Sequence, residues 1–381
     1  MPGSLIEVSN NVPEIRISQA QFQTEPGPTD GKSPAAPVSS EAAGVRKFLL
    51  GRGNSAIADR GFHWLMVLCA LTIFGIVVLI ATELVWGSQL TWNKFGFSFF
   101  SWPAGFTFES VIKSVIDPSA PQPNYWDPVN GVFSALPFLY GTLITSFLAL
   151  LMAVPLAIGV AVFLTEMCPQ ALRGPLTFIS ELLAAIPSVI YGLWAMFVLV
   201  PMMREHLNPL LVQLLGWTGA FASDNPTGLG FFSAGIILAI MILPIISSLT
   251  REVMTAVPHS QREAALALGA TRWEMIRMAV LRNARIGIVG AIILGLGRAL
   301  GETMAVTMVI GNSMEIRRSL LSNGNTMASV IANQFSEASD NLHLSALVEI
   351  GLALFVVTII VNAIAQLLVW AVTRGAPARV Q

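Results

Sequence analysis

Six long hydrophobic runs alternate with polar connections over most of the chain. Only the fifth run contains charged residues, and the runs cover residues 64–82, 137–165, 182–203, 225–250, 286–314 and 350–373. An α-helix needs about 20 residues to cross the hydrocarbon core of a bilayer. The pattern therefore predicts an all-α, polytopic membrane protein with six transmembrane helices, in a membrane domain that spans residues 61–375.

The N-terminal 60 residues have a different pattern. Prolines are mixed there with Ser, Gln and Glu, and no long apolar run occurs. Such a composition buries too little apolar surface to offset the entropy of ordering the backbone. We expect residues 1–60 to form a disordered arm.

The overall composition agrees with lipid as the main solvent. Of the 381 residues, 54% are hydrophobic and 11% are charged, against roughly 25% charged in soluble domains. The formal net charge of −1 argues against a globally basic chain, so nucleic acid is not an expected partner.

Lysine and arginine positions predict the orientation. With the N-terminus in the cytoplasm, the inner segments hold 15 basic residues and the outer segments hold five. Because cytoplasmic loops are enriched in Lys and Arg, both termini are expected in the cytoplasm. Residues 85–135 then form an external loop, and residues 251–285 form the most basic cytoplasmic loop.

That cytoplasmic loop carries helix-start and helix-end signals. Ser260 with Glu263, and Thr271 with Glu274, have the spacing of two capping boxes, and Gly269 suits a left-handed helix end. The sequence therefore predicts two short helices joined by a sharp turn at Gly269. On the first helix, one face is formed by Ala264, Ala265 and Leu268, small enough to enter another protein's groove.

The same loop resembles the EAA motif of bacterial ABC importer permeases. The resemblance rests on Glu263-Ala264-Ala265 followed by Gly269. It departs where the family pattern ends in Leu-Pro, because this chain has Leu281-Arg282. The resemblance implies a type I ABC importer permease fold, with a coupling helix at residues 260–282 that docks on a separate ATPase through Glu263, Ala264, Ala265, Leu268 and Gly269.

The fifth run carries an arginine and a glutamate within the predicted span. Arg298 is twelve residues beyond Ile286, or about 18 Å along a helix, which places it near the middle of the membrane. Glu302 follows four residues later and is expected on the same helix face. Gly297 and Gly301 form a small-xxx-small pair that would let a neighbouring helix pack closely.

Two interpretations of this charged pair follow from the residues alone. Arg298 could present its forked donors to a passing oxyanion, with Glu302 preventing the anion from being held too tightly. Alternatively, Arg298 and Glu302 could form a permanent ion pair that fixes helix packing. Charged groups inside a membrane are usually functional, which favours the first interpretation.

Several stretches resemble the PstC-type permeases of bacterial phosphate importers. They are Arg298-Ala-Leu-Gly-Glu302-Thr-Met-Ala-Val306, Ile310-Gly311-Asn312, the segment 183–192 and Tyr140-Gly141-Thr142. The resemblance implies a role for Arg298 and Glu302 in phosphate passage. The choice of phosphate over sulfate or molybdate depends on this resemblance.

The resemblance to PstC-type permeases also implies a multi-pass subunit that is embedded in the lipid of the bacterial inner membrane. Such a subunit is non-catalytic and is expected to need no cofactor and no metal. The expected partners are a second, PstA-like permease, two ATP-binding subunits and an external phosphate-binding protein.

Two other classes of function fit the sequence less well. An ion-coupled transporter could use Arg298 and Glu302 as a relay, but it leaves the cytoplasmic loop unexplained. A membrane-embedded enzyme is disfavoured because the four histidines are scattered and no nucleophile motif occurs. The acidic residues at the ends of hydrophobic runs, Glu166, Glu181 and Glu349, are expected to be solvated at headgroup level.

Overall fold

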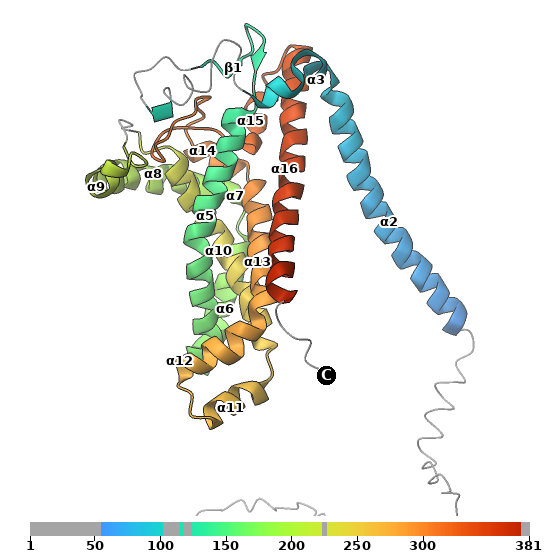
Figure 1. The fold of residues 1–381 in the computed structure, drawn as a ribbon, viewed down its shortest axis with the longest axis vertical. Helices are drawn as coiled ribbons and strands as arrows, with labels where there is room; N and C mark the ends of the chain where they lie inside the picture. The colour runs from blue at the N-terminus through green and yellow to red at the C-terminus, as the bar shows by residue number, and fades with distance from the viewer. Residues whose placement is uncertain (1–54, 102–114, 117–122, 223–226, 375–381) are drawn as a thin grey trace, which may run out of the picture. The chain divides into compact units, whose positions relative to one another are not determined.

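The computed structural model describes residues 55–101, 115–116, 123–222 and 227–374 (Figure 1). The chain divides into two units, the first ending at Leu71 and the second beginning at Thr72. Residues 1–54 of the predicted arm lie outside the described residues, and residues 55–60 already belong to a helix. The following description concerns the second unit unless it says otherwise.

The described elements are almost all helical. In the first half of the chain they are α2 (Ser55–Gly87), α3 (Gln89–Phe95), η1 (Gly96–Phe100), β1 (Trp126–Asp127), β2 (Val132–Phe133), α5 (Leu136–Val162), η2 (Phe163–Met167), α6 (Gln170–Ala185), α7 (Ser188–Trp194) and η3 (Ala195–Leu199). The remaining elements are α8 (Val200–Met202), η4 (Met203–Leu207), α9 (Asn208–Leu215), η5 (Gly216–Thr218), α10 (Phe231–Thr255), α11 (His259–Ala267), α12 (Arg272–Met275), η6 (Ile276–Leu281), α13 (Arg282–Leu300), α14 (Met304–Val309), α15 (Met327–Gln334) and α16 (Asn341–Arg374).

The prediction of six membrane-spanning helices is confirmed. Six helical stretches of the described chain are long and apolar enough to cross a membrane: 59–87, 136–167, 188–218, 231–255, 272–300 and 341–367. The fifth ends earlier than the hydrophobic run predicts, because α13 ends at Leu300 and Gly301 leaves the helical conformation. The segment that follows contains the short helix α14 and then an irregular stretch up to α15.

Helices α5 and α10 form the centre of the second unit and lie side by side (Figure 1). Along α5, fully buried alanines recur every fourth residue at Ala149, Ala153 and Ala157. At Gly235 of α10, an added Cβ would lie 2.9 Å from the Leu148 Cβ. Small residues at this spacing let the two backbones approach closely, which is how helices associate in lipid.

The irregular segment after α14 docks on the start of α5. The Tyr140 hydroxyl donates to the Arg317 carbonyl (3.1 Å), and the Met327 amide donates to the Thr142 hydroxyl oxygen (2.9 Å). Between them, Gly141 lies so close to the Asn325 carbonyl that a Cβ would be 2.0 Å from that oxygen. The Tyr-Gly-Thr triplet therefore holds the segment that links α14 to α15.

We expect Gly141→Ala to destabilise the protein by about 1–3 kcal/mol, as overpacked sites do, because the new methyl group would displace a backbone carbonyl. Gly159→Ala in the same helix is the matched control, since nothing lies within 4 Å of its Cβ position. An alanine there should be neutral or stabilising by up to about 1 kcal/mol. Thermal unfolding of the detergent-solubilised variants measures both effects, and equal melting temperatures would contradict the prediction.

Candidate functional site

Arg298 lies in the last turn of α13, on a helix face that the rest of the second unit leaves uncovered. This stripe consists of Ile286, Gly290, Leu294, Arg298 and Gly301, all of them exposed. An added Cβ at Gly290 would meet nothing within 4 Å, and at Gly301 it would meet only the carbonyl of Gly297, one turn below. The stripe is therefore open to a ligand, a lipid or a second protein.

The predicted packing at Gly297 and Gly301 is not made inside the second unit. A Cβ at Gly297 would likewise meet nothing within 4 Å. The described helices that contact α13 approach it from other faces, as at Gly295, where a Cβ would lie 2.7 Å from the Ile246 side chain of α10. The small-xxx-small pair is thus available to a helix from another chain.

The expectation that Glu302 shares a helix face with Arg298 is wrong. Because α13 ends at Leu300, Glu302 lies in the turn between α13 and α14, where its side chain is buried. Its carboxylate accepts a hydrogen bond from the Ala305 amide (3.3 Å), in the first turn of α14. Among the described residues, the ion pairs do not include one between Arg298 and Glu302.

Helix α7 supports this turn. Gly192 permits a close crossing of α7 and α14, since its Cβ would lie 2.9 Å from the Ala305 Cα. The Tyr191 hydroxyl donates to the Leu183 carbonyl (2.8 Å). Pro187 separates α6 from α7 because it cannot continue a helix. The segment 183–192 therefore supports α14 and the turn that precedes it.

The predicted architecture of the cytoplasmic loop is largely confirmed. Helices α11 and α12 are joined at Gly269, whose φ of +84° is left-handed. Thr271 and Glu274 form the expected capping box. The box predicted for Ser260 and Glu263 is wrong, because Pro258 is the N-cap of α11 and Ser260 therefore lies inside the first turn.

Helix α11 and its C-terminal turn present residues of the resembled motif on the surface. Glu263, Ala264 and Gly269 are exposed, while Ala265 is half-buried against the neighbouring helices. The Leu268 side chain is 89% exposed. A leucine so exposed at the tip of a loop is suited to insertion into a groove of another protein.

An ion pair that the sequence did not reveal fixes α11 to the rest of the protein. The Arg262 guanidinium lies 3.1 Å from the Glu166 carboxylate, with side chains 11% and 9% exposed. The only sequence signal was a glutamate at the end of a hydrophobic run and an arginine in the basic loop. Which glutamate meets which arginine depends on the tertiary fold.

The three acidic residues expected at headgroup level differ in their surroundings. Glu181 is exposed and pairs with Arg251 (3.0 Å). Glu166 is buried against Arg262, and Glu349 of α16 is only 1% exposed, so the expectation of solvation is wrong for both. Neither carboxylate oxygen of Glu349 has a hydrogen-bond partner in the described part of the chain.

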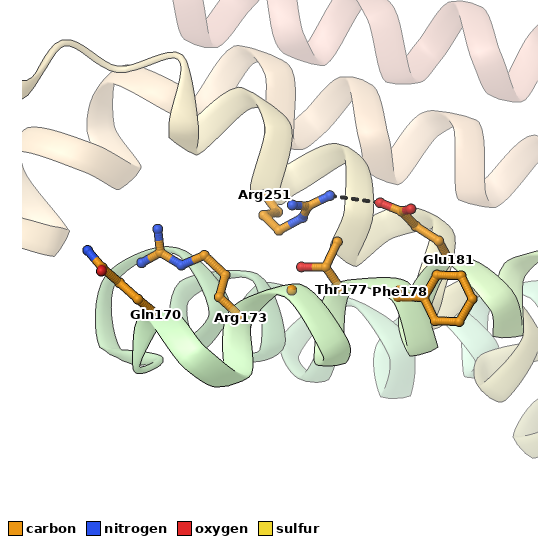
Figure 2. A pocket seen from close by; sticks show the side chains of 7 residues that line it. Gln170, Arg173, Thr177, Phe178, Glu181 and Arg251 are labelled. Carbon is orange, nitrogen blue, oxygen red and sulfur yellow. Dashed lines mark hydrogen bonds and ion pairs between the residues drawn. The ribbon is translucent and has the colours of Figure 1, made fainter. Parts of the chain in front are cut away.

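A pocket lies between α6 and the end of α10 (Figure 2). It is lined by Gln170, Arg173, Gly174, Thr177, Phe178, Glu181 and Arg251. Both arginines already have partners, since Arg251 pairs with Glu181 and Arg173 donates to the Thr165 carbonyl (2.8 Å). These contacts join α6 to α10 and to η2, the turn that continues α5.

Comparison with known proteins identifies the family to which the chain is similar. The family described as "Binding-protein-dependent transport system inner membrane component" matches residues 153–374, which include α11 and the whole of α13. The phosphate transport system permease protein PstC of Pasteurella multocida is 44% identical over 326 residues, covering 85% of this chain and 95% of that protein.

Two further similarities are of different kinds. The PstC protein of Haemophilus influenzae is 43% identical over 319 residues, covering 83% of this chain and 94% of its own length. Among solved structures, a bacterial ABC transporter involved in the import of the acidic polysaccharide alginate aligns with a TM-score of 0.49 and 16% identity. That alignment covers 84% of this chain and 99% of the other.

Proposed function

Because the chain belongs to the family of binding-protein-dependent transport system inner membrane components, and within it to the PstC phosphate transport permeases, we propose that Arg298 and Glu302 line its phosphate path. The chain is a multi-pass inner membrane protein and the permease subunit of a phosphate ABC importer. The observation that carries the proposal is an arginine on an uncovered helix face, in the last turn of the fifth membrane-spanning helix.

The position of Arg298 requires a polar partner. A charge in the hydrocarbon region is costly, about 2.5–3.5 kcal/mol at its centre, so the guanidinium should face a cavity or an anion rather than lipid. Its planar fork of donors matches two oxygens of a phosphate group. Because the side chain is exposed and not paired with Glu302, these donors are available.

Glu302 contributes differently from a direct ion pair. Its carboxylate is held in place by the Ala305 amide at the turn that follows Arg298. A fixed negative charge near the guanidinium reduces the net attraction for an anion. Phosphate would then bind Arg298 without being trapped there.

The uncovered stripe supports a path shared with a second, PstA-like permease. Gly290, Gly297 and Gly301 would let a helix of the partner approach the α13 backbone closely. Each permease would then form half of the pathway. An external phosphate-binding protein would deliver the substrate to its outer end.

We place ATP hydrolysis on two separate ATP-binding subunits that dock on α11 and its C-terminal turn. Glu263, Ala264, Ala265, Leu268 and Gly269 would enter a groove on one of these subunits. ATP binding would draw the coupling helices together and shift the pore between its inward-facing and outward-facing states. Arg282 occupies the position of the family's motif proline and lies at the start of α13.

We expect Arg298→Gln to reduce phosphate uptake by at least about tenfold, because charge-assisted hydrogen bonds contribute about 1.5–3 kcal/mol each. The measurement is radiolabelled phosphate uptake into proteoliposomes that hold the complete importer, with ATP on the nucleotide side. Arg204→Gln is the matched control, since Arg204 is exposed and pairs with the adjacent Glu205. Normal uptake by the assembled Arg298→Gln complex would refute the proposed path, and inhibition by excess sulfate would refute selectivity for phosphate.

Leu268→Ser tests the docking site. Removing a leucine from a buried contact costs about 1.5–3 kcal/mol, so retention of the ATP-binding subunits during purification should fall about 10- to 100-fold. The fold should be unaffected because the side chain is exposed. Leu214→Ser, at another exposed leucine, should retain them. Equal retention by both variants would remove Leu268 from the interface.

A further inference from the structure

We propose that Arg262 and Glu166 form the joint through which movement of α11 reaches the membrane core. The inference rests on the proposed docking of α11 on an ATPase, and it assigns both residues a positioning role in transport. Neither residue belongs to the exposed docking face or to the uncovered stripe of α13.

One guanidinium connects three parts of the fold. The Arg262 Nε and Nη2 atoms donate to the same oxygen of Glu166 (3.2 and 3.1 Å). Nη2 also donates to the Met254 carbonyl (2.8 Å), and Nη1 donates to the Val257 carbonyl (2.5 Å). The side chain therefore satisfies carbonyls at and just after the end of α10 while it holds the glutamate.

The partners of Arg262 belong to the two central helices. Glu166 lies in η2, the π-helical turn that continues α5, and Met254 lies in the last turn of α10. Helices α5 and α10 make the most extensive helix pair of the described chain. A displacement of Arg262 would therefore pull on both central helices at the same point.

Helix α11 has two different faces. Arg262 is directed inward and is buried, whereas its neighbours Glu263 and Ala264 are exposed. A second link to the body of the protein is exposed, where the Asn283 amide donates to Gln261 (2.6 Å). A force applied at Leu268 would thus reach the end of α10 through the buried arginine, in addition to the packing of the half-buried Ala265.

The burial of this pair gives it a stiffness that a surface pair lacks. Removing one partner of a buried pair leaves an uncompensated charge, so the two side chains resist separation. The pair between Arg251 and Glu181 lies on the same side of the protein and joins α6 to α10 at 3.0 Å. Its side chains are 27% and 56% exposed, so solvent screens it and it contributes little.

The test measures coupling in the complete importer, reconstituted in proteoliposomes with radiolabelled phosphate and ATP. Arg262→Gln and Glu166→Gln should assemble and hydrolyse ATP within about twofold of the unaltered complex. Phosphate transported per ATP hydrolysed should fall at least fivefold in each. The double variant should be no worse than either single variant, because both changes break the same contact. Arg251→Gln and Glu181→Gln, the matched controls, should keep the normal ratio.

Two results would overturn the inference. One is an unchanged ratio of phosphate to ATP in the assembled Arg262→Gln and Glu166→Gln complexes. The other is a failure of the nearly isosteric Glu166→Gln chain to fold or assemble, which would make the pair a structural anchor only. The Leu268→Ser result separates the two proposals: if Leu268 matters and Arg262 does not, docking stands and only the joint fails.

Discussion

The close contact of α5 with α10 is the interaction on which the rest of the structure depends. Lipid offers no hydrophobic force to drive two apolar helices together, so close backbone packing has to supply the attraction. Buried alanines at four-residue spacing on α5 make that packing possible. Each end of α5 binds another part of the chain. At its start, Tyr140 and Thr142 hold the segment before α15. Beyond its other end, Glu166 in η2 pairs with Arg262 of the cytoplasmic loop.

The end of α13 at Leu300, within the predicted fifth span, determines how Arg298 and Glu302 are arranged in the candidate path. A continuous helix would have stacked Glu302 on Arg298 and favoured a closed ion pair. Ending α13 at Leu300 instead turns Glu302 toward the first amides of α14 and leaves the arginine exposed. Irregular backbone inside a membrane protein is tolerated only where protein or water satisfies its polar groups. The crossing of α7 over α14 provides such cover on one side.

The features that the sequence predicted correctly are those set by local chemistry. The lengths of the hydrophobic runs predicted the six spans, and Gly269 predicted the left-handed turn. The spacing of Thr271 and Glu274 predicted the capping box. The errors concern choices made by tertiary structure. Pro258 displaced the Ser260 box, and Gly301 ended a hydrophobic run that could have continued as helix. Helix packing decided that Glu349 is buried and that the Glu166 side chain is enclosed beside Arg262.

The uncovered stripe of α13 is the strongest structural argument for the proposed second permease. Its glycines expose backbone, and Arg298 adds a full charge, so lipid alone would be a poor solvent for this face. A second permease can cover the glycines while water and anions occupy the space at the arginine. The proposed docking divides α11 in the same way, with its exposed face toward an ATP-binding subunit and its buried arginine in the core. Under the proposed coupling, the two faces of α11 would have to move as one rigid body.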